Sequence, residues 1–179
     1  MIAYDLIGQT PLVLLESFSD ENVKIYAKLE QFNPGGSIKD RLGKYLIEKA
    51  IDEGRLKEGD TIVEATAGNT GIGLAIASNR HKVKCIIFAP EGFAEEKISI
   101  MKALGADVRR TPKVEGMTGA QQEALAYATR YGYLYMNQFE TKDNPGAYTQ
   151  TLAKQLTDEL SHIDYFVAGV GSGGTFTGV

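Results

Sequence analysis

Residues 61–89, TIVEATAGNTGIGLAIASNRHKVKCIIFA, contain the pattern that decides the fold. The apolar run Thr61–Ala65 predicts a short strand, Gly71–Asn79 predicts an apolar helix, and Val83–Ala89 predicts a second strand. A strand, a helix and a strand in this order predict a right-handed crossover that makes the two strands parallel.

The same alternation extends in both directions from this unit. Towards the N-terminus, Leu12–Leu15 and Val23–Leu29 predict a hairpin. Towards the C-terminus we expect helices at Glu95–Leu104, Ala120–Arg130 and Gly146–Leu160, a loop at Thr111–Gly119, and strands at Asp107–Arg110, Tyr133–Asn137 and, strongly buried, Tyr165–Val170. The sequence therefore predicts an α/β fold of mostly parallel, twisted sheets flanked by helices.

Composition excludes several classes of function. The chain has 179 residues, of which 43% are hydrophobic and 23% charged, and its formal net charge is −4. This balance argues against nucleic acid or an anionic membrane as a partner. The N-terminal MIAYDLIGQTP lacks a signal-peptide pattern, and no apolar run approaches the ~20 residues of a transmembrane helix, so we expect a cytoplasmic protein. Cys85 is the only cysteine and there are two histidines, which predicts no disulfide and no metal centre.

The C-terminus predicts that further chain follows. Val179 comes a few residues after a glycine-rich turn that should open a helix. One helical turn without continuation is not stable alone. We therefore expect two domains, with this chain truncated in the second; a compact, rearranged end is the alternative.

The string GVGSGGT, Gly169–Thr175, follows the last predicted strand. A strand, a glycine-rich turn and a helix start place backbone N–H groups around a phosphate, and Ser172 and Thr175 add hydroxyl donors. The string also fits the G-x-G-x-x-G pattern of dinucleotide-binding folds. A plain tight connection is equally compatible with this loop alone.

A second strand-to-helix turn is EATAGNTGIG, Glu64–Gly73. It is not a Walker loop, because no Gly-Lys-Ser/Thr follows. Its threonines and Asn69 supply polar side chains, and its glycines let a ligand approach the backbone closely. A helix start with spare amides suits a carboxylate, while a simple capped helix is the alternative.

The third stretch is FNPGGSIKDR, Phe32–Arg41, in which Ser37 predicts the start of a helix and Asp40 supports its first turn. Lys39 and Arg41 fall in that first turn, where the helix dipole disfavours cations. This position suits a lysine that works as a neutral amine. We expect Arg41 to turn away into a salt bridge.

Together the three stretches describe one kind of site. Ligands of open α/β sheets bind at the carboxyl ends of the strands, where both loops are expected. A phosphate at one loop and a carboxylate at the other, with an amine between them, describe pyridoxal phosphate bonded to lysine and reacting with an amino acid.

These residues also carry a family resemblance. NPGGSIKDR resembles the asparagine-proline-x-glycine-serine-x-lysine-aspartate-arginine motif of the cysteine synthase and cystathionine β-synthase family, the fold-type II pyridoxal phosphate enzymes. TAGNTG resembles the substrate-carboxylate loop of that family, and GSGGT resembles its phosphate loop. EGMTGA and NQF match lesser family segments in the expected order, so that the resemblance covers essentially the whole chain.

The resemblance implies a role for each matching residue. Lys39 would be the catalytic residue and the lysine that bonds pyridoxal 5'-phosphate, and Asn69 would hydrogen-bond the cofactor's ring hydroxyl. The cofactor's phosphate would be held by Gly171, Ser172, Gly173, Gly174 and Thr175. The substrate carboxylate would be bound by Thr66, Ala67, Asn69, Thr70 and Gln138.

The resemblance further implies a smaller, moving substrate-loop domain at residues 35–142 and a larger cofactor-phosphate domain made of 1–34 and 143–179, incomplete in this chain. Family members form homodimers, and some bind the C-terminal tail of serine acetyltransferase. The residue that faces the pyridine nitrogen in the family lies in the part missing here, so we expect residues 1–179 alone to turn over poorly.

The implied reaction is β-replacement on O-acetylserine or serine with sulfide, giving cysteine. Many cysteine synthases have serine where this chain has Ala67, and alanine is typical of members that resemble O-acetylserine-dependent cystathionine β-synthases, which use homocysteine. An inactive cofactor- or partner-binding remnant and a nicotinamide enzyme are the other hypotheses.

Overall fold

The computed structural model describes residues 2–93 and 95–179. Its centre is a four-stranded sheet in the order β5-β4-β3-β6. The strands are β3 (Thr61–Ala65), β4 (Lys84–Pro90), β5 (Asp107–Thr111) and β6 (Leu134–Tyr135), and every pairing is parallel. The predicted α/β class with a mostly parallel sheet is therefore confirmed.

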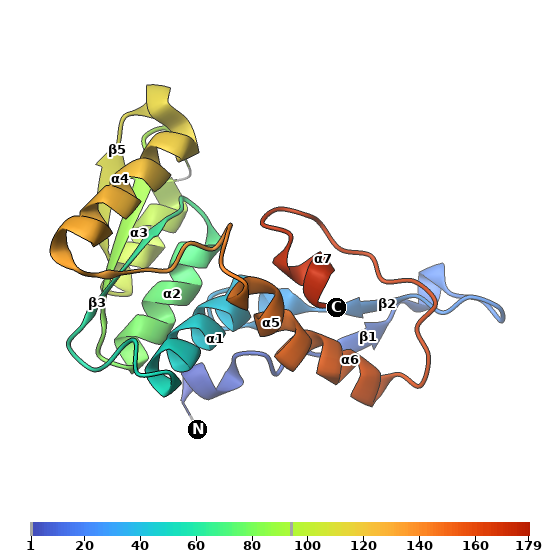
Figure 1. Cartoon of the computed structure of the whole chain (residues 1–179). Helices are drawn as coiled ribbons and strands as arrows, with labels where there is room; N and C mark the ends of the chain where they lie inside the picture. The colour runs from blue at the N-terminus through green and yellow to red at the C-terminus, as the bar shows by residue number, and fades with distance from the viewer. Residues whose placement is uncertain (1, 94) are drawn as a thin grey trace.

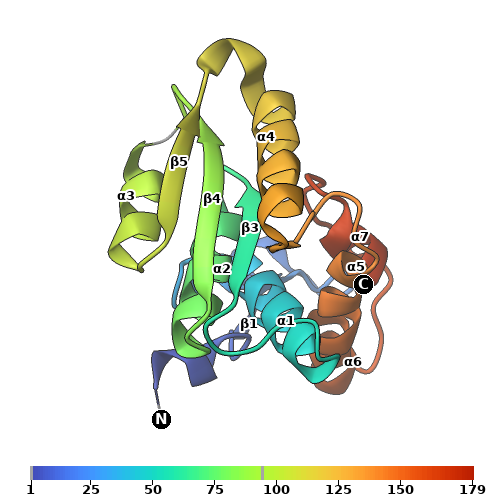
Figure 2. The same ribbon diagram turned by 60° about the vertical axis from the view of Figure 1, so that its left-hand side comes forward.

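Helices cover both faces of this sheet. Figure 2 shows α4 (Gly116–Tyr131) on one side and α2 (Asn69–Arg80) on the other, with α3 (Glu95–Ala103) beside β5. Side chains alternate across each strand. Val63 and Phe88 therefore pack against a stripe of alanines on α4, whereas Ile62 and Ile87 join the core beneath α2. The alanines of the stripe are Ala120, Ala124 and Ala128. The small side chains of that stripe bring α4 close to the sheet.

The start of α4 differs from the prediction. The chain forms a short 3-10 helix at Lys113–Glu115 and enters α4 at Gly116, so part of the expected loop Thr111–Gly119 is helical. The apolar repeat that predicts the helix begins only at Ala120, because the preceding turn is rich in glycine and threonine and gives no periodic signal.

The remaining elements lie at the other end of the molecule, with α1 (Lys39–Asp52) between the two parts (Figure 1). The predicted hairpin is present as antiparallel β1 (Leu12–Leu14) and β2 (Tyr26–Lys28). The predicted helix Gly146–Leu160 is a continuous helical segment: α5 (Asp143–Tyr148), a π-helical turn (Thr149–Ala153) and α6 (Lys154–Glu159). Further 3-10 turns occur at Ala3–Leu6, Glu16–Phe18 and Glu30–Phe32, and α7 spans Gly174–Gly178.

The predicted buried strand at Tyr165–Val170 is wrong. The segment forms no strand, and Tyr165 and Val167 are 89% and 91% exposed. Within residues 2–93 and 95–179 no strand pairs with it, because the parallel sheet ends at β6 and the hairpin contains only β1 and β2. An apolar run becomes a buried strand only where neighbouring strands and a covering layer are present.

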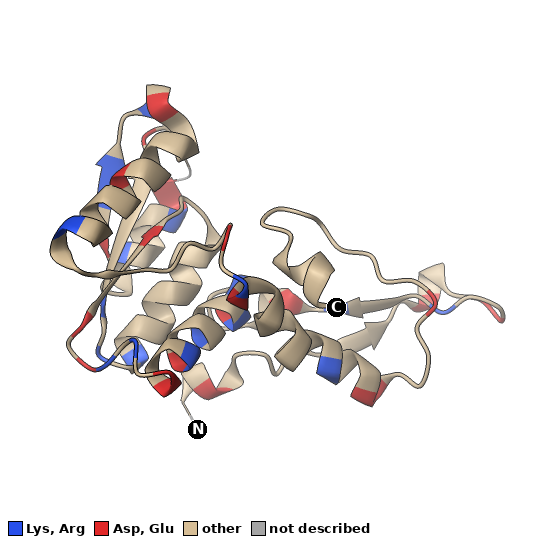
Figure 3. Cartoon of the chain, in the orientation of Figure 1, with Lys and Arg blue, Asp and Glu red and all other residues tan. Residues whose placement is uncertain are grey.

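Charge is distributed unevenly along the chain. Figure 3 shows acidic and basic residues interspersed over the helices and strands, whereas Tyr165–Val179 contains no charged residue. Among the described helices, none combines the length and the apolar character that crossing a bilayer requires. The described residues also contain no group of three or more histidine, cysteine, aspartate or glutamate side chains that could hold a metal ion.

Candidate active site

The turn before α1 is fixed by the residues of the NPGGSIKDR stretch. Ser37 Oγ accepts a hydrogen bond from the Lys39 backbone N–H at 3.2 Å, and the Asp40 carboxylate accepts one from the Gly35 N–H. A Cβ built on Gly35 would overlap that carboxylate, so only glycine allows the turn to close on it. Burial raises the pKa of Asp40 to about 6, although the hydrogen bond from Gly35 opposes the rise. The turn therefore starts the helix at Lys39.

The starts of α1 and α2 touch without intervening side chains. A Cβ built on Gly43 would overlap the Gly73 backbone, and one on Gly73 would overlap the Lys39 carbonyl group. This backbone contact sets the lysine beside the Thr66–Thr70 turn that precedes and opens α2.

The Lys39 amine lies among hydroxyl groups. Its Nζ is 3.3 Å from Tyr148 Oη and 3.2 Å from Ser172 Oγ. In the described part of the chain no carboxylate forms an ion pair with it. Burial lowers the pKa of Lys39. The direction matches the neutral amine expected from the sequence, but the cause is burial.

A cleft of about 390 Å³ opens in front of Lys39. Six of the predicted site residues line it: Lys39, Thr66, Ala67, Gln138, Gly171 and Ser172. Gly68 adds backbone, and four residues with no predicted role complete the lining, namely Phe93, Met117 and Phe139 as apolar walls and Lys97 as a second cation. The remaining predicted residues Asn69, Thr70, Gly173, Gly174 and Thr175 are not part of the lining.

The two predicted parts of the carboxylate site lie together. Thr70 Oγ1 donates to Gln138 Oε1 at 2.7 Å, although the two residues are far apart in sequence. Thr66 Oγ1 accepts from the Gly68 N–H at 3.1 Å. Asn69 is the first residue of α2 and is half-buried beside them. The structure thus brings Thr66–Thr70 and Gln138 to one side of the cleft.

A buried carboxylate that carried no prediction supports this arrangement. Glu64, at the end of β3, accepts hydrogen bonds from the Ala65 N–H at 2.7 Å and the Gln138 N–H at 3.0 Å. Burial raises the pKa of Glu64 to about 7 in spite of these two donors. The available signal was a charged residue inside an otherwise apolar strand.

The glycine-rich loop closes the opposite side. Ser172 Oγ accepts from Lys39 Nζ and also from Asn144 Nδ2 at 3.0 Å, and the same Asn144 nitrogen donates to the Gln138 carbonyl at 2.7 Å. A Cβ on Gly174 would overlap Asn144 Oδ1, a buried atom with no hydrogen-bond partner in the described chain. Asn144 therefore joins the carboxylate side of the cleft to the glycine-rich loop.

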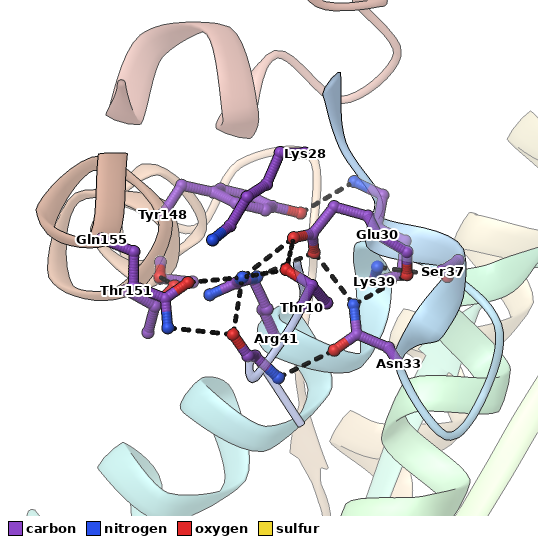
Figure 4. Close-up of polar contacts among 12 residues, drawn as sticks. Thr10, Lys28, Glu30, Asn33, Ser37, Lys39, Arg41, Tyr148, Thr151 and Gln155 are labelled. Atoms are coloured by element: carbon purple, nitrogen blue, oxygen red, sulfur yellow. Dashed lines mark hydrogen bonds and ion pairs between the residues drawn. The ribbon is translucent and has the colours of Figure 1, made fainter. Parts of the chain in front are cut away.

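The expected salt bridge of Arg41 is present, and it is buried. Arg41 Nε and Nη2 bond the two carboxylate oxygens of Glu30 at 2.8 Å each, and Nη2 also contacts the Gly8 carbonyl, Thr10 Oγ1 and Gln155 Oε1 (Figure 4). The contacts join the N-terminal segment, the turn before α1, α1 itself and α6. Arg41 thus anchors the helix that carries Lys39.

A second pocket of about 300 Å³ lies between α1 and the segment that follows β6. Its lining includes Arg55, Tyr135, Glu140 and Asp143 but none of the predicted site residues. The candidate chemistry therefore belongs to the cleft at Lys39.

Comparisons with known proteins agree with this assignment. A family model described as "Pyridoxal-phosphate dependent enzyme" matches residues 3–179. The chain is 50% identical over 177 residues to the O-acetylserine dependent cystathionine beta-synthase of Bacillus subtilis, and 48% identical over 183 residues to a cysteine synthase of Helicobacter pylori. Each alignment covers 97% of this chain but 58% of the relative, so the chain spans little more than half the length of these relatives.

Solved structures give the same relationship in three dimensions. The O-acetylserine dependent cystathionine beta-synthase of Helicobacter pylori superposes with a TM-score of 0.92 at 46% identity, covering 99% of this chain and 61% of that one. An O-ureido-L-serine synthase superposes with a TM-score of 0.91 at 36% identity, covering 98% and 56%.

Proposed function

The chain belongs to the pyridoxal-phosphate dependent enzyme family, and from this premise we propose that the protein catalyses β-replacement on O-acetylserine or serine with sulfide, giving cysteine. The observation that carries the proposal is the Lys39 amine, held between Tyr148 and Ser172 at a cleft lined by both predicted loops. The relatives named cysteine synthase support the same reaction.

Residues that line the cleft, together with their chain neighbours, fit the family's cofactor. Lys39 would bond it, Asn69 would meet its ring hydroxyl, and the Gly171–Thr175 segment would hold its phosphate. Two observations support this fit: a Cβ on Gly171 would meet nothing within 4 Å, which leaves room beside its backbone, and the Ser172 hydroxyl already faces Lys39. When bound, pyridoxal phosphate supplies an electron sink for the negative charge that develops at the substrate's Cα.

The chain's own groups then have definite tasks. The Thr66–Thr70 turn and Gln138 would bind the substrate carboxylate through hydroxyl, amide and backbone N–H donors. Lys39 Nζ would take the proton from Cα and later return it, which requires a neutral amine at the operating pH. Burial favours that state, because it lowers the pKa of Lys39. The apolar walls formed by Phe93, Met117 and Phe139 would limit water at the reacting carbon.

A second candidate is cystathionine β-synthesis from O-acetylserine and homocysteine. Lys97 lines the same cleft and forms no ion pair within the described residues, so it offers a cation to the carboxylate of a second amino acid. Ala67 and the similarity to the O-acetylserine dependent cystathionine beta-synthase of Bacillus subtilis also support this second candidate. Turnover with sulfide and with homocysteine, measured on the same O-acetylserine-loaded sample, decides between the two. A strong preference for homocysteine would replace the cysteine synthase assignment.

We further propose that residues 35–142 are the smaller, moving domain and that 1–34 with 143–179 belong to the larger one. The proposal includes a cytoplasmic homodimer and an active site open to the C-terminal tail of serine acetyltransferase. Analytical ultracentrifugation with and without a tail peptide tests both associations.

Cofactor trapping tests the central assignment. The chain incubated with pyridoxal phosphate and dialysed should keep a visible absorbance band, and borohydride should fix the cofactor on the Lys39 peptide. Lys39→Ala should abolish both signals, whereas Lys57→Ala, at an exposed lysine, should leave them unchanged. A remnant that binds no cofactor, or a nicotinamide enzyme, would show neither signal in the unmodified chain.

A further inference from the structure

Tyr148 lies against the reacting amine and belongs to none of the sequence motifs. It is the last residue of α5, its side chain is completely buried, and its hydroxyl is 3.3 Å from Lys39 Nζ. The Lys39 nitrogen also lies 5.7 Å from the centre of the Tyr148 ring. Figure 4 shows the tyrosine reaching from its helix towards the start of α1. The contact joins residues that are 109 positions apart in the sequence.

The surroundings hold Tyr148 in one place. The π-helical turn Thr149–Ala153 begins directly after it, and such turns are frequent at functional sites. A Cβ on Gly178 would lie 2.9 Å from Tyr148 Cβ, so α7 packs directly on the tyrosine. Thr149 Oγ1 donates a hydrogen bond to the Gly178 carbonyl at 2.8 Å, which also holds α7 against the end of α5. Tyr148 is thus enclosed by α1, α5 and α7.

The charged groups around the pair are few. Lys97 of α3 lines the cleft that contains Lys39, and Asp40 beside Lys39 in the chain bonds Gly35. Glu30 and Arg41 lie behind Tyr148, with opposite effects on its ionisation. Burial is the main cause that raises the pKa of Tyr148 to about 12, and a hydrogen bond with Thr175 opposes it. At neutral pH Tyr148 is therefore an uncharged hydroxyl that both accepts and donates hydrogen bonds.

We propose that Tyr148 is a further catalytic residue whose hydroxyl accepts a hydrogen bond from the protonated Lys39 amine and donates one to the neutral amine. The proposal rests on the proposed function, in which the proton moves between the substrate's Cα and Lys39 Nζ. Tyr148 keeps its own proton throughout and holds Nζ in place in both protonation states. A carboxylate in the same position would stabilise the ammonium ion and prevent Lys39 from acting as a base.

Competitive acetylation of the cofactor-free chain, followed over pH and read at the Lys39 peptide by mass spectrometry, tests the contact without any turnover. Tyr148→Phe keeps the ring but removes the acceptor for the ammonium form. The midpoint of Lys39 labelling should move to lower pH, so that labelling below both midpoints is about threefold to tenfold faster, which is the excess of a hydrogen bond to a charged group over one to a neutral group. Tyr131→Phe, at a half-exposed tyrosine of α4, is the matched control and should leave the midpoint unchanged.

Two further measurements separate the possible outcomes. Ser172→Ala removes the other hydroxyl beside Lys39; a midpoint that moves in this variant but not in folded Tyr148→Phe would overturn the proposal. Borohydride trapping in the unmodified chain tests the proposed function independently. If the cofactor is trapped on Lys39 and Tyr148→Phe labels like Tyr131→Phe, the tyrosine has no role and the function stands. If trapping fails while the midpoint moves, the contact is real and the proposed reaction is wrong.

Discussion

Replacing Arg41 by methionine should strongly destabilise the fold. The guanidinium makes two bonds of 2.8 Å to Glu30 and contacts Gly8, Thr10 and Gln155. Methionine keeps much of the apolar stem and removes every one of these contacts. The variant therefore isolates the loss of the charge partner from the loss of packing.

The expected size follows from the burial of both partners. The side chains of Arg41 and Glu30 are 1% and 14% exposed, so the carboxylate left behind is almost without water. Removing one partner of a buried ion pair costs about 3–5 kcal/mol, against a total stability of about 5–15 kcal/mol for a domain. With a urea dependence of about 2 kcal/mol per molar, the unfolding midpoint should fall by about 2 M.

The pH dependence of this loss is a second measure. Burial alone would raise the pKa of Glu30, but hydrogen bonds from Arg41 and Thr10 outweigh it and hold the pKa below its usual 4.5. A lowered carboxyl pKa contributes stability above the unfolded-state value and loses it as pH falls through the folded-state value. The difference between the parent chain and Arg41→Met should therefore shrink below about pH 4.5.

Urea unfolding followed by far-ultraviolet circular dichroism provides the assay. Lys82→Met is the control, because Lys82 and Glu58 form an exposed pair, 72% and 67% accessible, and such pairs contribute about 0–1 kcal/mol. Adding Glu30→Gln to Arg41→Met should recover part of the loss by removing the unpaired charge. The reasoning is refuted if Arg41→Met behaves like Lys82→Met, or if the double variant loses at least the sum of the two single losses.

Three further predictions concern buried groups. Burial raises the pKa of Glu64 to about 7, so the folded state binds this proton more tightly than the unfolded state. The contribution of Glu64 to stability therefore falls as pH rises from about 4.5 through 7. In thermal melts, the stability of Glu64→Gln relative to the parent chain should be higher at pH 8 than at pH 5. Gly73→Ala should cost about 1–3 kcal/mol in urea unfolding, because its Cβ would overlap the Lys39 backbone, whereas Gly169→Ala should be neutral. Cys85, whose pKa burial raises to about 12, should react with a thiol reagent only in urea; rapid labelling of the native chain would contradict this.

The sheet was predictable because its signals are local. Each strand of the β3–α2–β4 unit is a short apolar run, and a helical repeat separates the two. The parallel pairing then follows from the crossover rule. The structure shifts the predicted Val83–Ala89 by one position, to Lys84–Pro90, and this strand pairs in parallel with β3 as predicted.

The segment Tyr165–Val170 shows where local signals fail. Its apolar residues are compatible with a buried strand, but the sequence of the segment does not indicate which strand would pair with it. Burial requires a partner strand from elsewhere, and residues 2–93 and 95–179 provide none. The same limit applies to α4, whose first turn is helical although it carries no apolar repeat.

The site divides in the same way. Lys39, Thr66, Gln138 and Ser172 each stand in a stretch that resembles a family motif, and the resemblance implies their roles. Tyr148 and Asn144 lie in ordinary helical sequence, so their roles follow only from contacts formed on folding. Glu64 is recognisable as a charge inside an apolar strand, but its contact with Gln138 also forms only on folding.

Lys39 itself illustrates why the motif and the fold are both needed. The position of the lysine in the first helical turn favours a lowered pKa through the helix dipole, an effect that is screened by salt and fades within one turn. The structure adds enclosure by Tyr148 and Ser172, residues 109 and 133 positions away, and burial is the cause that lowers the pKa of Lys39. The NPGGSIKDR stretch can therefore start the helix, because Asp40 accepts a hydrogen bond from Gly35 in the turn and Arg41 pairs with Glu30 before it. The lowered pKa of the amine depends on its burial by α5 and the glycine-rich loop. A peptide with the motif alone would keep an ordinary, solvated lysine.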